Sequence, residues 1–391
     1  MNDIKIILYK DIIYRYFYMI VSKRKAIDNI SHSNKKIRLS SDKNMIYINK
    51  KIESINDLIN IGEQYRPNKT YNINVKKIFN LLPTLKKLNT VIGMETVKKS
   101  IVNQIIYFIQ DFQDKNSDML HTVIQGPPGV GKTMLGEIIG EIYYKLDIIT
   151  QPDKKSKPIT SSDDSDCCSA PKQQSKEGYK FVIAKRSDLI GKYLGHTAAK
   201  TQEVIDKSLG GVLFIDEAYS LGNPEGRDSF SKECIDTINQ NLTEKKNQLL
   251  VIIAGYKEAL DSCFFSYNEG LRRRFPFVYT IEKYKNTEMS CILKKMIEEL
   301  GKDWSVITDD KTLNIFFDKN MKLFPNSAGD IETLVFNIKI EHSKRVFCYP
   351  PHSKSRKKIS KEDIDNAINI YKINKEKKED KIPEWLSHLY T

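Results

Sequence analysis

The sequence lacks the cysteine pattern of a zinc protein or of a disulfide-bonded secreted domain. Its six cysteines in 391 residues include no CxxC pair and no Cys/His spacing suited to zinc. Cys167 and Cys168 are adjacent, but they lie in a polar stretch of low complexity. The absence excludes a zinc-finger framework and favours reduced thiols in an intracellular, cytoplasmic protein.

Long apolar runs are also missing. An apolar stretch near the N-terminus, residues 4–21, is interrupted by four charged side chains: Lys5, Lys10, Asp11 and Arg15. A membrane-spanning helix needs about 20 mostly apolar residues without such charges. We therefore expect no membrane span and no secretory signal.

Acidic residues are scarce at the N-terminus. Residues 1–90 hold 18 lysines and arginines against 7 acidic residues, a net charge of +11, whereas the remaining 301 residues carry only +2. Such a segment suits nucleic acid, anionic lipid or an acidic partner, and it equally fits a solvated lysine-rich surface. Its clusters at 23–25 and 35–38 have the spacing of a two-part nuclear address, which leaves a nuclear location open.

Changes in composition and in hydrophobic pattern divide the chain into four regions. They are a basic, partly disordered N-terminal region (1–85), an α/β core (86–283), a helical region (284–373) and a C-terminal tail (374–391). A helical pattern beginning at Val75 is expected to be interrupted by Pro83. Inside the core, residues 150–178 are rich in Lys, Ser, Asp and Gln, which predicts a disordered insertion.

The core predicts a parallel sheet with helices on both faces. Strands are expected at 121–125, 180–184, 211–216 and 248–255, and helices at 132–145, 197–209 and 229–243. Two of the strands are continuously apolar, as strands buried on both faces should be. After Tyr284 helical spacing takes over, and the last helix is expected to start at Ser360 with Asp363 at capping-box spacing.

A glycine-rich loop between the first strand and helix has the pattern of a phosphate-binding loop. Its residues are Gly126, Pro127, Pro128, Gly129, Val130, Gly131, Lys132 and Thr133, followed by Met134. Glycines let backbone N–H groups surround phosphate oxygens, and the helix N-terminus adds positive charge. Lys132 is predicted to reach the β- and γ-phosphates of ATP, and Thr133 to bind Mg²⁺.

A strand ending in two carboxylates supplies the second half of the predicted site. Asp216 is expected to hold Mg²⁺, mostly through water, and Glu217 to polarise the attacking water. Alone, this segment also fits a strand followed by an acidic helix cap. Beside the phosphate loop it predicts an ATPase.

Together these segments resemble the AAA+ family of ATPases. Residues 126–133, 188–201, 211–221 and 252–256 match its motifs in order, closest to the branch of CbbX and stage V sporulation protein K. The match covers roughly residues 88–284, with weaker support to about 371. The resemblance implies the α/β fold of a P-loop NTPase, a parallel sheet flanked by helices and followed by a small all-helical lid, which binds and hydrolyses ATP with Mg²⁺.

The resemblance implies further roles. Ile92 and Gly93 match the segment that sandwiches adenine. Lys192 and Tyr193 match a pore loop that grips a protein chain inside a hexameric ring, and the alternative is that Tyr193 is a buried strand-end tyrosine. Residues 271–275 match the arginine-finger region, in which a guanidinium reaches the neighbouring subunit's γ-phosphate.

Three points stay open at this stage. Arg273 and Arg274 are the favoured fingers, but the alignment also allows Arg272, and three adjacent arginines equally fit a solvated basic turn. The position of the family's first sensor residue falls at or near Tyr256. The arginine expected as the second sensor is missing, because Gly329 aligns with it.

The predicted function is an ATP-hydrolysing homo-oligomeric ring, expected to be a hexamer, that remodels or threads a protein partner. One alternative is a nucleic-acid-stimulated ATPase recruited through the basic N-terminal region. Another is an ATP-bound scaffold with little turnover.

Overall fold

The computed structural model describes residues 45–114, 118–149, 173–176, 179–193, 195–223, 228–350 and 352–379. Contacts divide the chain into two units, Met1–Tyr47 and Ile48–Thr391. In the first unit the described residues hold strand β1 (Met45–Ile46). Most of the basic N-terminal segment, most of the predicted insertion at 150–178 and residues 380–391 of the tail lie outside the described residues, so the domain boundaries stay a prediction.

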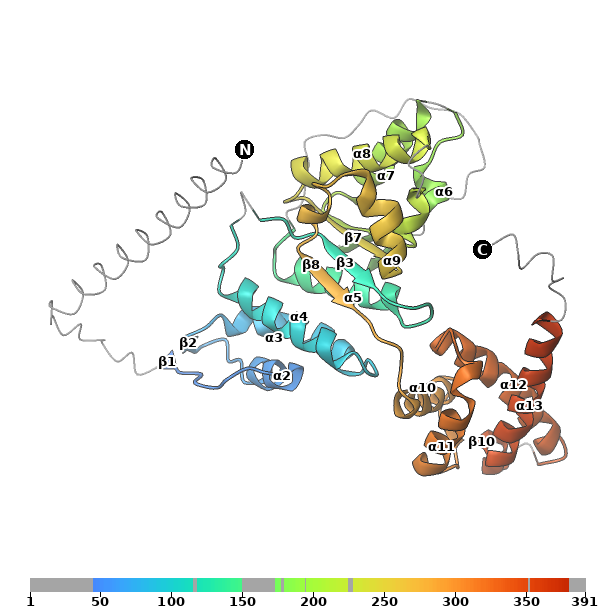
Figure 1. Ribbon diagram of the computed structural model, residues 1–391. Helices are drawn as coiled ribbons and strands as arrows, with labels where there is room; N and C mark the ends of the chain where they lie inside the picture. The colour runs from blue at the N-terminus through green and yellow to red at the C-terminus, as the bar shows by residue number, and fades with distance from the viewer. Residues whose placement is uncertain are drawn as a thin grey trace, which may run out of the picture. The chain divides into compact units, whose positions relative to one another are not determined.

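The core of the second unit is a six-stranded sheet with the order β4-β5-β6-β7-β3-β8. Figure 1 labels β7, β3 and β8 of this sheet. The strands are β3 (Thr122–Gln125), β4 (Gln173–Lys176), β5 (Tyr179–Ala184), β6 (Gly211–Ile215), β7 (Leu249–Gly255) and β8 (Phe277–Thr280). The five from β5 to β8 are parallel, and the edge strand β4 is antiparallel to β5. The predicted parallel sheet is confirmed, with β4 and β8 as strands that the sequence did not reveal.

Helices cover both faces of the sheet, as the apolar strands predicted. On β6, Val212 and Phe214 join one apolar cluster, whereas Leu213 and Ile215 join another. The first cluster includes helix α5 (Lys132–Lys145), and the second includes α7 (His196–Ser208) and α8 (Ser229–Glu244). Because successive side chains of a strand point to opposite faces, β6 is buried on both sides.

Three helices precede the sheet. They are α2 (Ile55–Glu63), α3 (Val75–Asn89) and α4 (Glu95–Ile109), with strand β2 (Thr70–Tyr71) between the first two. The interruption predicted at Pro83 is wrong, because α3 continues through this residue to Asn89. Pro83 is exposed, so water can bond the carbonyl that its missing N–H leaves free, while Leu81 and Leu85 keep the helix packed.

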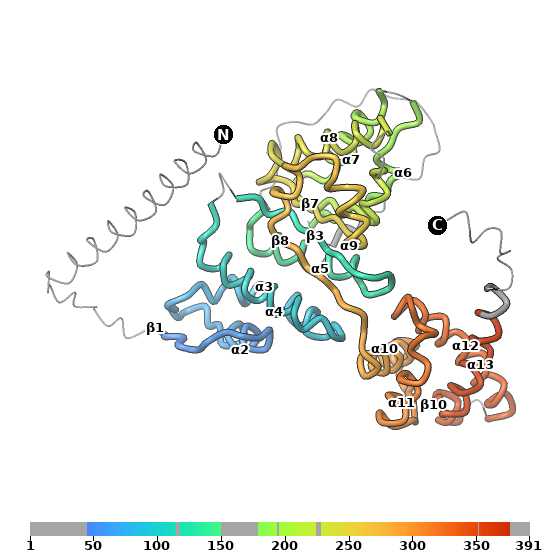
Figure 2. Tube along the Cα trace, viewed as in Figure 1, coloured from blue at the N-terminus to red at the C-terminus, as the bar shows by residue number. Residues whose placement is uncertain are grey.

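The C-terminal part of the unit is helical and forms the lid (Figure 2). Its helices are α10 (Asn286–Glu298), α11 (Asp310–Asn320), α12 (Ala328–Val346) and α13 (Lys361–Glu379), and the two-residue strands β9 (Ser305–Val306) and β10 (Lys358–Ile359) pair in parallel. The capping box is confirmed, because the Ser360 N–H donates to Asp363 Oδ2 over 2.9 Å and Asp363 N–H to Ser360 Oγ over 3.4 Å. Among the described helices, none is long and apolar enough to cross a membrane.

Candidate nucleotide site

The two halves of the predicted ATP site line one cavity of about 260 Å³. Its walls come from the glycine-rich loop, from the end of β6 and from the end of β7: Pro128, Gly129, Gly131, Lys132, Thr133, Asp216, Glu217, Tyr219, Gly255 and Tyr256. The loop and the two carboxylates are separated by more than 80 residues of chain. The parallel sheet brings them together, because the carboxyl ends of its strands meet at one edge.

The glycine-rich loop is held closely against the lid. Gly129 has φ +68°, and a Cβ there would lie 2.0 Å from the Asn326 carbonyl oxygen, so only glycine fits. The Ala328 N–H at the start of α12 donates to the Gly129 carbonyl over 3.2 Å. The Tyr284 hydroxyl donates to the carbonyl of buried Val130 over 2.9 Å. Two lid-side contacts therefore fix the loop.

Lys132 lies within this loop, at the first turn of α5. Its Nζ donates to the carbonyls of Gly126 over 3.0 Å and of Pro127 over 2.7 Å. Burial lowers the pKa of Lys132, and the carboxylates of Asp216 and Glu217 oppose that shift. To contact a phosphate, the ammonium group exchanges these carbonyls for phosphate oxygens.

Asp216 and Glu217 present two carboxylates to the cavity. Burial raises the pKa of Asp216, and the Glu217 carboxylate adds to the rise. Glu217 has a left-handed backbone, φ +51°, and its N–H donates to Asp216 Oδ1 over 3.1 Å. The described residues contain no cluster of three metal-ligating side chains. Asp216 and the Thr133 hydroxyl instead fit Mg²⁺, which keeps several waters and is bound together with phosphates.

Two tyrosines form one wall of the phosphate cavity, and the sequence had assigned a role to Tyr256 but none to Tyr219. Tyr219 and Tyr256 stack with ring centroids 5.4 Å apart, and Lys132 Nζ lies 5.3 Å from the Tyr256 ring. Burial, with the nearby Glu217 carboxylate, raises the pKa of Tyr219 to about 12. Tyr256 therefore stands in the phosphate cavity, at the position predicted for the first sensor. The only sequence signal for Tyr219 was its place two residues after Glu217.

A second cavity of about 370 Å³ adjoins the first, since Gly129 and Gly131 line both. The core contributes Val91, Ile92 and Met134, and the lid contributes Tyr284, Ile292, Lys295, Met296, Glu299, Ala328, Gly329 and Glu332. The largely apolar wall suits a flat aromatic base. Gly93 does not line the cavity. It forms the turn behind Ile92, with φ +70°, where a Cβ would lie 2.7 Å from a Glu288 carboxylate oxygen.

The three adjacent arginines have different surroundings, and none lines the phosphate cavity. Arg272 pairs with Asp261 and covers the Phe265 ring, with its guanidinium carbon 4.3 Å from the centroid. Arg274 donates to Thr243 Oγ1 and to the Gly270 carbonyl, each over 2.9 Å. Arg273 is exposed and makes no hydrogen bond or ion pair with any described residue.

Lys192 and Tyr193 lie away from both cavities, between α6 (Arg186–Leu189) and α7. Tyr193 is 68% exposed, and its ring makes an edge contact with the His196 ring, 5.6 Å between centroids. The interpretation as a buried strand-end tyrosine is therefore wrong. An exposed aromatic ring beside a lysine forms a tip that can contact another chain.

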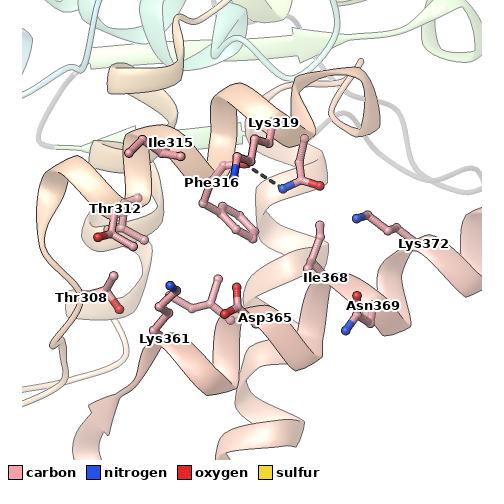
Figure 3. A pocket seen from close by; sticks show the side chains of 13 residues that line it. Thr308, Thr312, Ile315, Phe316, Lys319, Lys361, Asp365, Ile368, Asn369 and Lys372 are labelled. Carbon is pink, nitrogen blue, oxygen red and sulfur yellow. Dashed lines mark hydrogen bonds between the residues drawn. The ribbon is translucent and has the colours of Figure 1, made fainter.

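A separate groove of about 350 Å³ runs between α11 and α13 in the lid. Figure 3 shows Ile315 and Phe316 on one side, and Asp365 and Ile368 on the other. Its polar residues include three lysines, Lys319, Lys361 and Lys372. The groove shares no lining residue with the two nucleotide cavities.

Comparison with known proteins independently indicates the family that the sequence motifs resemble. Residues 122–283 match the ATPase family associated with various cellular activities (AAA). A cfxQ-like protein of Acanthamoeba polyphaga mimivirus is 40% identical over 82% of this chain and 73% of its own length. The stage V sporulation protein K of Bacillus subtilis (strain 168) is 34% identical over 55% of this chain and 59% of its own length.

Two further matches concern another relative and a solved structure. A protein CfxQ homologue of Trieres chinensis is 31% identical over 76% of this chain and 91% of its own length. Among solved structures, the FIGL-1 AAA domain in complex with ADP aligns over 72% of this chain and 83% of its own, with 17% identity and a TM-score of 0.48.

Proposed function

Because the chain belongs to the AAA family of ATPases, in the branch of the CfxQ-like proteins and stage V sporulation protein K, we propose that it hydrolyses MgATP within an oligomeric ring and uses that energy to remodel a protein partner. One observation carries the proposal. The phosphate-binding loop and the Asp216–Glu217 pair, distant in sequence, line the same cavity.

The residues of this cavity divide the chemistry between them. Lys132 and the backbone N–H groups of the loop hold the phosphates, and Thr133 with Asp216 holds the Mg²⁺ that neutralises their charge. Glu217 accepts a proton from the attacking water, or orients it. The base fits the adjoining cavity between Ile92, Met134 and the lid, where Gly329 leaves open space.

Hydrolysis by this site depends on a second copy of the chain. Lys132 is the only cation among the residues that line the phosphate cavity. A further positive charge near the γ-phosphate increases the rate of ATP hydrolysis by a large factor. Arg273 is exposed and unpaired among the described residues, while Arg272 and Arg274 are engaged within the chain. Arg273 is therefore the proposed finger, supplied to a neighbouring subunit.

Tyr193 and Lys192 are the proposed contact with the protein substrate. The exposed ring offers apolar contact that tolerates many sequences, which suits a motor that pulls on an extended chain. In a closed ring, copies of this tip would converge on one axis.

Glu217→Gln is the variant that tests this function. It removes the base but keeps the phosphate contacts, so it should bind ATP, lose turnover by a factor of about 10³ or more, and accumulate as assembled rings. Native mass spectrometry with ATP measures the assembly, and phosphate release measures turnover. Monomers alone at micromolar concentration would rule out the ring. Proteins captured by the trapped ring but lost on Tyr193→Ala would support threading.

Two other functions predict different results. A nucleic-acid-stimulated ATPase should turn over faster with DNA or RNA, with a steep salt dependence. An ATP-bound scaffold should show a low turnover that Glu217→Gln leaves unchanged. Stimulation by a protein, with no response to nucleic acid, supports the remodelling function over both.

A further inference from the structure

The lid contains the largest of the cavities described, and its wall is strongly positive. The cavity measures about 830 Å³ and shares no lining residue with the nucleotide site. Five cationic side chains line it: Lys339, Lys354, Arg356, Lys357 and Lys358. Asp303 is the only acidic residue in the wall.

Most of these cations lack an acidic partner among the described residues. Lys357 Nζ lies 3.3 Å from an Asp303 carboxylate oxygen, and that carboxylate is 78% exposed. The side chains of Lys354 and Lys358 are exposed and make no hydrogen bond or ion pair with the described part of the chain. Like charges gathered around one concave wall produce a positive potential that concentrates anions.

An aromatic ring stands in the same wall. Trp304 is partly exposed and packs against the His342 imidazole, with ring centroids 5.6 Å apart. His342 is itself fixed, because Nδ1 lies 3.0 Å from Asp363 Oδ2 and Nε2 lies 2.8 Å from the Arg356 carbonyl oxygen. The indole therefore rests on a rigid buried neighbour and can serve as a platform.

We propose that this lid cavity binds single-stranded nucleic acid, with backbone phosphates on Lys354 and Lys358 and a base against Trp304. Sites of this kind combine a positive groove with aromatic rings on which bases stack. The volume of about 830 Å³ lies within the range of roughly 300–1,000 Å³ that is typical of ligand pockets. An acidic polypeptide would bind the cationic side chains but would have no base to stack on the Trp304 indole.

The position of Trp304 gives the proposal a local signal. The chain has two tryptophans, so Trp385→Phe leaves Trp304 as the only one. Titration of that variant with oligouridine or oligothymidine of about ten nucleotides should quench its fluorescence saturably, and the affinity should fall steeply with salt. The measurement needs no ATP hydrolysis, so its result is independent of whether the proposed motor function is correct.

A charge-reversed pair tests the residues. Lys354→Glu with Lys358→Glu should weaken binding by roughly tenfold or more at 0.1 M salt and reduce the salt slope by about 1.4, since each phosphate contact on a single strand contributes about 0.7. The control pair is Lys319→Glu with Lys372→Glu, in the groove between α11 and α13. It changes the net charge equally and should leave binding within about twofold. Unchanged melting temperatures show that both pairs are folded.

Several results would overturn the proposal. One is the absence of saturable quenching with either strand at micromolar concentration. Another is equal weakening by both charge-reversed pairs, which would mean attraction by net charge alone. Equal affinity for polyglutamate would assign the cavity to an acidic polypeptide, and full competition by tripolyphosphate would assign it to a small phosphorylated compound.

Discussion

His121, which directly precedes β3, is a buried histidine with two defined partners. The Val251 N–H donates to Nδ1 over 3.1 Å, and Nε2 lies 2.9 Å from the Leu242 carbonyl oxygen. These partners require a neutral ring with its proton on Nε2. Burial lowers the pKa of His121 to about 4 from 6.5, assisted by the positive Arg274 and opposed by the Leu242 carbonyl.

This histidine should make the protein sensitive to mild acid. The unfolded chain takes up the proton near pH 6.5 and the folded one only near 4. The contribution of His121 to the free energy of unfolding is therefore fully present above about pH 6.5. It falls by about 3 kcal/mol as the pH drops to 4. Urea unfolding at several pH values measures it. His121→Gln removes the titrating group, so its stability should change less over that window, and parallel curves would contradict the assignment.

The sequence could not show which of the three adjacent arginines is available to a neighbouring subunit. Arg272, Arg273 and Arg274 are chemically identical and adjacent, so no pattern distinguishes them. Their roles separate only through residues distant in the chain, Asp261 for the first and Thr243 for the third. The placement of Lys132, Thr133 and Asp216 in one cavity was predictable, because it depends on the local strand–loop context of each segment.

At the scale of elements, the start of α12 holds an unusual backbone. Ser327 precedes the helix with φ +51° and ψ −115°, a region that favours glycine, and its side chain makes no capping bond. Its neighbour Ala328 donates to the phosphate loop. The strain therefore lies at the junction of lid and nucleotide site.

Ser327→Gly should raise the stability of the folded protein. Relief of the strained conformation is worth about 1–3 kcal/mol, and the extra freedom of glycine in the unfolded chain offsets about 1. The expected net gain is roughly 1 kcal/mol in urea or thermal unfolding. Ser54→Gly is the control, because Ser54 has an ordinary φ of −137° and accepts the Asp57 N–H. It should lower stability by a few tenths of a kcal/mol or more. The reverse order of the two variants would contradict the explanation.

Elements with a clear period were predictable, and those that depend on tertiary contacts were not. Helix α5 occupies the predicted residues 132–145, and β6 and β7 match within one residue at each end. Strand β8 has four residues of which only Tyr279 is buried, so its sequence carries no strong signal and its pairing with β3 defines it. The interruption predicted at Pro83 was wrong for the same reason, because packing maintains α3 around this residue.

At the scale of the whole molecule, the proposed ring makes each active site a shared one. Arg273→Ala should still bind ATP but lose turnover by about 10³-fold, whereas Arg272→Ala should keep most activity and lose some stability. Mixing Arg273→Ala with Glu217→Gln should restore partial turnover, because the second variant supplies the arginine that the first lacks. Phosphate release from mixed rings, identified by native mass spectrometry, measures this. Mixed rings without restored turnover would contradict a finger acting between subunits.

The distribution of charge also becomes clear only at this scale. Residues 91–391 carry a net charge of only +2, yet residues 339–358 hold seven lysines and arginines against one glutamate. Averaging over 301 residues concealed that run, and the fold then brings Asp303 and Trp304 beside it. Net charge per region therefore did not predict where the protein presents a positive surface.

The contact between Ala328 and Gly129 has a mechanical consequence. Helix α12 has 19 residues, so it extends about 28 Å from that contact at 1.5 Å per residue. A tilt of about 10° around its first residue would displace its far end by roughly 5 Å. Lys339 and His342, in the wall of the positive cavity, lie beyond the middle of this lever. A displacement of the phosphate loop that tilted α12 in this way would therefore be larger at the surface of the lid than at its origin.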